Sequence, residues 1–160
     1  MNGGNDTNER PLLPAVMTAG ASLVVCLAAF APWYTTQVAE VFSQGSVSGW
    51  NATLVAKIAV AAAAVALLGS LAITADARHL IDLAPELLRA IVIACAVGCT
   101  VAALAVAYRT MWIPEPTEFL TRDLGLFLAL AASLVAFGAS VVQVVIGTGS
   151  AADTPPRGRR

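Results

Sequence analysis

The stretch Leu124–Ile146, LGLFLALAASLVAFGASVVQVVI, holds no charged residue and is long enough to cross a bilayer as a helix. A hydrocarbon core about 30 Å thick requires about 20 predominantly apolar residues in a helix. Three further apolar stretches of similar length precede it in the chain: Leu12–Ala31, Thr53–Ile73 and Leu87–Tyr108. The sequence therefore predicts an all-α fold, an integral membrane bundle of four transmembrane helices.

The composition of the chain agrees with a membrane protein and excludes several other classes. Of its 160 residues, 58% are hydrophobic and 12% are charged, whereas about 25% are charged in an ordinary soluble domain. The formal net charge of −1 provides no basic surface for nucleic acid, so we expect no nucleic-acid partner. The lipid bilayer is the partner that the apolar stretches require.

The polar ends of the chain frame a single transmembrane domain, residues 12–146. Residues 1–11 are rich in Gly and Asn, and residues 147–160 contain Gly, Pro and a terminal group of Arg. Neither end can bury enough apolar surface to fold, so both are expected to be disordered. The first apolar stretch ends in Ala29-Phe30-Ala31, a pattern of small residues typical of signal-peptide cleavage sites, but it exceeds their usual length of about 7–15 apolar residues. We therefore expect this helix to be retained.

The distribution of basic residues predicts that both ends of the chain lie in the cytoplasm, because cytoplasmic segments carry an excess of Lys and Arg. With the N-terminus inside, the cytoplasmic side holds Arg10, Arg78, Arg89, Arg157, Arg159 and Arg160. The outer side then holds only Arg109, Arg122 and Lys57. Aromatic residues, which prefer the headgroup region, fall at the predicted outer helix ends: Trp33, Tyr34, Trp50, Tyr108 and Trp112.

The outer connection Pro32–Ala52 has the composition of a small β-hairpin. Tyr34–Val38 is rich in β-favouring residues, and a Ser/Gly-containing turn follows at residues 43–46. Such a hairpin would be marginal by itself, because isolated two-stranded hairpins are barely stable. On the cytoplasmic side, Leu80 and Ile81 indicate that the connection between the second and third helices lies along the membrane surface.

The outer residues Trp33, Phe42 and Trp50 are the best candidates for contact with a partner protein, although interfacial anchoring is the simpler role for both Trp. Three of the predicted helices also carry small residues four apart, which let helix backbones approach closely. Such faces pack within one bundle, in a homo-oligomer or against another membrane protein. The residues are Ala62, Ala66 and Ser70; Ala94, Gly98 and Ala102; and Ala132, Ala136 and Ser140.

Lys57 is the one ionisable residue well inside a predicted helix. A charge within the membrane is costly and marks a functional site by default. Lys57 lies about four residues from the outer end of its helix, however, so its side chain can extend to the headgroups. It is therefore either a snorkelling residue or part of a transport pathway.

The chain holds no catalytic, cofactor or metal constellation, so we expect no enzymatic activity and no cofactor. Cys26, Cys95 and Cys99 lie inside apolar stretches, whereas a membrane thiol enzyme needs cysteine pairs at the water interface, where a thiolate can form. His79 is the only histidine, and a metal site would need further ligands beside it. No Asp or Glu lies within a predicted helix, which excludes proton exchange of the small multidrug type.

The segments Ala31-Pro32-Trp33-Tyr34 and Val47-Ser48-Gly49-Trp50, the second of which leads into an Ala/Val/Leu helix, resemble small four-helix membrane proteins of actinobacteria. Many of these proteins are uncharacterised, and some are encoded near tryptophan biosynthesis genes. The resemblance implies a multi-pass protein of the plasma membrane and carries over no catalytic residue. We expect a non-enzymatic accessory subunit or assembly factor. A transporter that uses Lys57 is the alternative, and a membrane thiol enzyme comes third.

Overall fold

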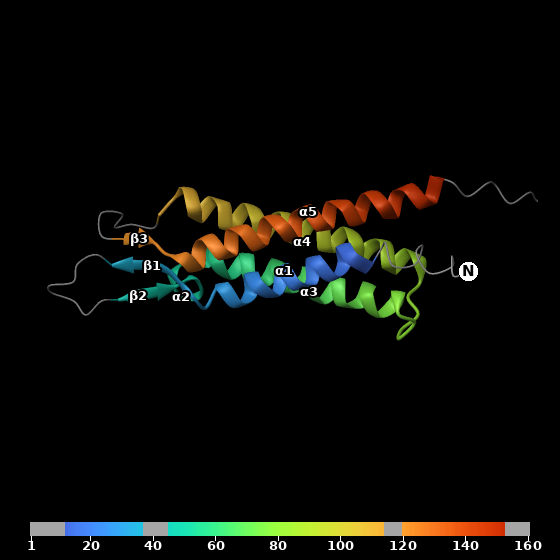
Figure 1. Cartoon of the computed structure of the whole chain (residues 1–160), viewed down its shortest axis with the longest axis horizontal. Helices are drawn as coiled ribbons and strands as arrows, with labels where there is room; N and C mark the ends of the chain where they lie inside the picture. Colours follow the sequence, from blue (N-terminus) through green and yellow to red (C-terminus); the bar gives the residue numbers. More distant parts are fainter. Residues whose placement is uncertain (1–11, 37–44, 114–119, 153–160) are drawn as a thin grey trace, which may run out of the picture.

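The computed structural model describes residues 12–36, 45–113 and 120–152 of the chain. In this part, four long helices lie side by side and a small antiparallel sheet covers one end of them (Figure 1). The helices are α1 (Leu12–Ala28), α3 (Leu54–Ala77), α4 (Pro85–Met111) and α5 (Leu124–Ala152). The fold is therefore mostly helical rather than all-α. We call the end that carries the sheet the sheet end, and the opposite end, where residues 78–84 join α3 to α4, the loop end.

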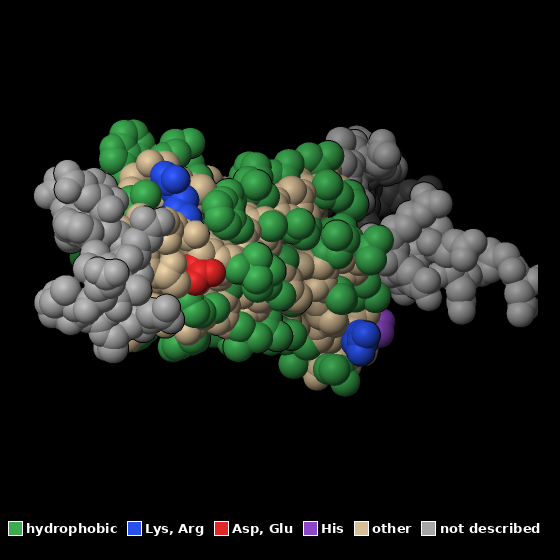
Figure 2. Space-filling model, turned by 60° about the vertical axis from the view of Figure 1, so that its left-hand side comes forward, with side chains coloured by type: hydrophobic (Ala, Val, Ile, Leu, Met, Phe, Trp, Pro, Cys, Tyr) green, Lys and Arg blue, Asp and Glu red, His purple; other side chains and the backbone are tan. Residues whose placement is uncertain are grey.

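Three of the described helices are long and apolar enough to cross a membrane: α3, α4 and the part of α5 from Leu124 to Ile146. The described part of α1 is apolar too, but it has 17 residues. On the face shown in Figure 2, hydrophobic side chains cover the middle of the molecule, while charged side chains lie toward its two ends. These features confirm a mostly helical protein with three candidate membrane spans, and they are consistent with the predicted membrane protein.

The first helix ends earlier than the predicted boundary at residue 31, because Pro32 begins a strand instead of following a helix. The chain leaves α1 through a tight turn in which the amides of Phe30 and Ala31 bond to carbonyls three residues back. The short helix α2 (Gly49–Ala52) then covers the end of α1. Its Trp50 amide donates to the Ala29 carbonyl at 2.8 Å, so α2 satisfies a carbonyl that the end of a helix would leave free.

The four long helices form a closed ring, in which α1 packs against α3 and α5, and α4 packs against the same two helices. The ring is held together mainly by small side chains, among them the fully buried Ala63 and Ala66 of α3. Small residues allow helix backbones to approach closely. One close approach of α4 to α3 is at Gly98, because a Cβ atom added there would lie 2.7 Å from the Ala62 carbonyl oxygen.

The sheet contains the predicted hairpin, formed by β1 (Pro32–Thr36) and β2 (Ser46–Ser48), and a third strand, β3 (Leu120–Arg122), that the sequence did not predict. The strand order is β2-β1-β3. β3 pairs antiparallel with the free edge of β1, where the hydroxyls of Thr35 and Thr121 lie 2.9 Å apart. This third strand gives the hairpin the support that two strands lack by themselves.

The later helices extend beyond their predicted ranges. α3 runs to Ala77 and α4 from Pro85 to Met111, so each exceeds the apolar stretch at its centre. α5 runs to Ala152, so the first part of the C-terminal tail predicted to be disordered is helical. Residues 1–11 and 153–160, for which we also predicted disorder, lie outside the described residues.

Candidate functional site

Trp33 is a core residue of the sheet end and not the surface contact that the sequence suggested. Its side chain is only 1% exposed. The indole Nε1 donates a hydrogen bond to the Ala28 carbonyl at 2.8 Å, at the end of α1. A Cβ atom at Gly49 would overlap the Trp33 indole, so a residue without a side chain is required there. Trp33 therefore locks α1, β1 and α2 together and offers no surface to a partner.

Tyr34, the next residue of β1, is buried to the same extent and joins the sheet to α4. Its hydroxyl donates to the Arg109 carbonyl at 3.3 Å. In the sheet, Tyr34 pairs with Arg122 of β3. Burial raises the pKa of the Tyr34 hydroxyl, while the positive charges of Arg109 and Arg122 act to lower that pKa. Tyr34 is thus a neutral, buried residue with two guanidinium groups close by.

The structure brings together two of the predicted site residues, Trp50 and Lys57. Trp50 is 38% exposed and stacks on Phe30, with ring centroids 5.7 Å apart. The Lys57 Nζ lies 5.7 Å from the centroid of the Trp50 ring. Lys57 is exposed on the outside of α3, and it does not point into the bundle. The remaining predicted residue, Phe42, lies outside the described residues.

A second aromatic and basic group lies at the end of α4. Tyr108 and Trp112 stack with centroids 5.4 Å apart, and the Arg109 guanidinium carbon is 5.7 Å from the centroid of Tyr108. Arg122 of β3 donates from Nη2 to the Met111 carbonyl at 3.3 Å. From the sequence, these residues are expected only as members of the aromatic belt or as markers of topology. The spacing of Tyr108 and Trp112, four apart on a helix, is the signal that could have paired them.

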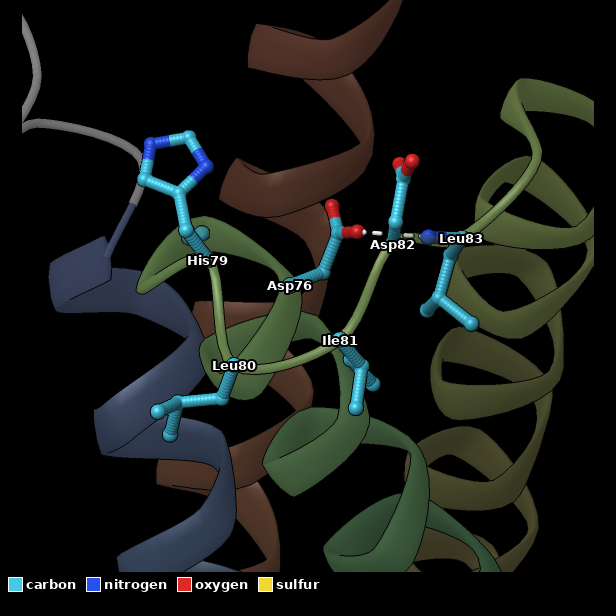
Figure 3. A pocket seen from close by; sticks show the side chains of 7 residues that line it. Asp76, His79, Leu80, Ile81, Asp82 and Leu83 are labelled. Carbon is cyan, nitrogen blue, oxygen red and sulfur yellow. Dashed lines mark hydrogen bonds between the residues drawn. The ribbon is translucent and has the colours of Figure 1, made fainter.

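The loop end is organised differently, as a hollow formed by the α3–α4 connection (Figure 3). Asp76 Oδ1 accepts a hydrogen bond from the Leu83 amide at 2.9 Å and closes the loop. Leu80 and Ile81 point back along the helices, whereas His79 and Asp82 point away from them (Figure 3). An amphipathic connection of this kind agrees with the predicted position along a membrane surface.

Polar side chains gather in the interior of the bundle, about midway along α4. The Cys99 thiol lies beside the hydroxyls of Ser22 and Ser140, and Ser70 Oγ is 3.9 Å from Cys95 Sγ. All three cysteines are free thiols. Among the residues that the structure describes, no group of three or more His, Cys, Asp or Glu residues could hold a metal ion. The contacts of Cys95 Sγ with Ser70 Oγ and with the Ala66 carbonyl oxygen at 3.6 Å join α4 to α3, whereas Ser22 Oγ is buried without a hydrogen-bond partner among the described residues.

The surface between α3 and α4 carries an open apolar groove. Its floor is made of small residues, namely Ala62, Ala90, Ala94 and Gly98, and its walls are larger side chains, namely Val65, Ile93, Val97 and Val101. The small residues four apart that the sequence singled out on α4 thus have two roles. Gly98 packs against α3, and Ala94 faces outward into the groove.

Comparisons with known proteins add no relationship to this description. None of the protein-family models, curated proteins or solved structures compared with the chain matches it.

Proposed function

We propose that this protein is a non-enzymatic, multi-pass protein of the plasma membrane that serves as an accessory subunit or assembly factor for another membrane protein. In this proposal α1 is the fourth transmembrane helix. The observation that carries the proposal is the apolar groove between α3 and α4, on the outside of a bundle whose own interior is filled by packed side chains.

The shape of the groove suits a transmembrane helix of the partner. Small residues such as Ala94 form the floor, and branched or long residues such as Val97 and Ile93 form the walls. Helix association within lipid depends on close van der Waals packing, because lipid tails are as apolar as the helices themselves. A ridge of side chains on another helix can fill such a groove, as ridges fill grooves between packed helices in general.

We propose that the sheet end faces outward and that both ends of the chain lie in the cytoplasm. The sheet end carries the stacked pairs Phe30–Trp50 and Tyr108–Trp112, which are typical of a headgroup boundary. The loop end carries Arg78 and, in the first turns of α4, Arg89, which favours the cytoplasmic side.

The transport alternative gains no support from the position of Lys57. The ammonium group lies over the Trp50 ring at the surface of the bundle, where a snorkelling lysine would be. The thiol-enzyme alternative has as little support, because Cys95 and Cys99 are buried inside the bundle.

The experiment that tests the proposal is purification of the tagged protein in mild detergent at native expression level, with mass spectrometry of the proteins that elute with it. The informative variant is Ala94→Leu, which fills the floor of the groove. Its control is Ala131→Leu, which enlarges an exposed alanine on α5. We expect a stoichiometric membrane protein with the wild type and with Ala131→Leu, and its loss with Ala94→Leu.

Two outcomes would contradict the proposal. Elution of the wild type as a homo-oligomer without another protein would favour self-association. A partner that Ala94→Leu retains as well as Ala131→Leu does would remove the groove from the interface.

A further inference from the structure

We propose that Arg109 and Arg122 form a binding site for a phosphate group at the sheet end, beside the stacked rings of Tyr108 and Trp112. This inference concerns residues other than the α3–α4 groove. A test of this inference is therefore independent of a test of the proposed partner.

Both arginines are fixed to the same end of α4 although they come from different elements. Arg109 lies in the last turn of α4, and its carbonyl accepts the hydrogen bond of the Tyr34 hydroxyl. Arg122 lies in β3 opposite Tyr34 and reaches the Met111 carbonyl with Nη2. The positive charges of both arginines act to lower the pKa of the Tyr34 hydroxyl. The fold thus brings two positive charges to one buried tyrosine.

These guanidinium groups have binding capacity that the described chain does not use. Arg109 Nε is buried and makes no hydrogen bond, and neither arginine forms an ion pair, within residues 12–36, 45–113 and 120–152. The adjacent carboxylate of Asp123 accepts a hydrogen bond from the Leu124 amide at 2.6 Å. A guanidinium group presents five N–H donors in a planar fork that matches two oxygens of a phosphate. Arg122 Nη2 already donates to the Met111 carbonyl and Arg109 Nε is buried, so the remaining N–H donors of the two groups, with their two charges, provide the site.

The surroundings of the site place it where phosphate groups occur at a membrane. Tyr108, Met111 and Trp112 are exposed around it, and Trp and Tyr side chains prefer the level of the lipid headgroups. The phosphodiester of a lipid headgroup and free inorganic phosphate share the chemistry that the two arginines recognise. Lys57 is the residue with which the two arginines can be compared within the same protein. It has the same charge and also lies over an aromatic ring at the sheet end, but it is an ammonium group that presents no planar fork.

The first arm of the test measures lipid binding to the purified full-length protein by native mass spectrometry, with phosphatidylglycerol as the probe. The variants are Arg109→Gln and Arg122→Gln, and the matched control is Lys57→Gln, which removes the same charge. We expect each arginine variant to bind phosphatidylglycerol about tenfold more weakly, as for the loss of one charge-assisted bidentate contact. Lys57→Gln should bind it as the wild type does.

The second arm uses the wild-type protein and therefore does not depend on how a variant folds. Phenylglyoxal modifies accessible arginines, and peptide mass spectrometry reports its reaction at Arg109 and Arg122. Bound phosphate should slow modification of both residues while leaving Arg78, at the loop end, unprotected. Protection by phosphatidylglycerol but not by inorganic phosphate would identify a lipid headgroup as the ligand. Protection by inorganic phosphate as well would identify a site open to soluble phosphate.

One pattern would overturn the proposal. If neither probe protects Arg109 and Arg122, or if both arginine variants bind phosphatidylglycerol as Lys57→Gln does, the two residues serve only to stabilise the carbonyl end of α4. That structural role is the one expected of basic residues at the C-terminus of a helix.

Discussion

The two ends of the bundle are built on different principles. At the sheet end, three strands and the buried side chains of Trp33 and Tyr34 connect elements from both halves of the chain. At the loop end, residues 78–84 connect only α3 to α4, and Leu80 is 74% exposed. The difference teaches that the sheet end ties several elements together through tertiary contacts, whereas the connection at the loop end is local to two helices.

The largest effect on stability is expected from removing the buried side chain at the centre of the sheet end. Trp33→Ala deletes a fully buried indole and its hydrogen bond to the Ala28 carbonyl, so we expect a loss of about 3–5 kcal/mol of stability. Thermal unfolding of the purified protein in detergent measures it. Trp50→Ala is the control, because that ring is partly exposed at the same end. Equal losses in the two variants would show that burial at the sheet end does not control stability.

The second effect tests the fit between α2 and Trp33. Gly49→Ala places a Cβ atom in the space of the Trp33 indole, and overpacking of this kind costs about 1–3 kcal/mol. Gly138→Ala is the matched control on α5, where an added Cβ meets no atom within 4 Å. We expect that control to be neutral or stabilising, because Ala is the better helix former. A harmless Gly49→Ala would mean that α2 and Trp33 are loosely packed.

A smaller effect, which depends on pH, is expected at Tyr34. Tyr34→Phe removes the hydrogen bond to the Arg109 carbonyl, worth about 1 kcal/mol. Burial raises the pKa of Tyr34 above its ordinary value of 10.0, so the folded state holds this proton more tightly than the unfolded state does. The stability due to Tyr34 is therefore complete below about pH 10 and decreases as the pH rises through the folded-state pKa.

Unfolding of the wild type and of Tyr34→Phe over the alkaline range measures this difference. The wild type should lose stability with rising pH more steeply than the variant does. Parallel profiles would indicate that Tyr34 titrates as an exposed tyrosine.

The smallest effect is expected at the loop end. Asp76→Ala removes the hydrogen bond from the Leu83 amide, and we expect at most about 1 kcal/mol of destabilisation. Limited proteolysis at residues 78–84 should increase more than global unfolding does, because local opening involves few buried contacts there. A large fall in the unfolding temperature would show that the loop end also fixes the helices.

The parts of the fold that the sequence predicted are those that depend on continuous apolar length. α4 and α5 each contain one of the quoted stretches, and α3 contains all of Thr53–Ile73 except its first residue, because a helix in lipid must satisfy its own backbone over the whole thickness of the membrane. β3 is different, since a strand of three residues has no periodicity to read. It forms because β1 offers a free edge beside the start of α5.

The positions of the site residues could likewise be predicted only in part from the sequence. Trp33 and Trp50 are the same residue type at the same end of the bundle, yet one is buried and the other partly exposed. Only the position of α2 over the end of α1 separates them, and that is a tertiary feature. The contact between Lys57 and Trp50 is local in the sequence, because the two residues flank the start of α3. Arg109 and Arg122, in contrast, are brought together only by the pairing of β3 with β1.

The central position of β1 has a consequence for the biosynthesis of the protein. β1 is made immediately after α1, but its second partner, β3, is made only after α4. One edge of β1 therefore stays unpaired while α2, α3 and α4 are synthesised, and an unpaired edge readily joins other chains. The sheet is completed only when β3 reaches the end of the bundle where β1 lies, which requires that α3 and α4 have packed along the length of the bundle. Closure of the sheet therefore follows the packing of the preceding helices.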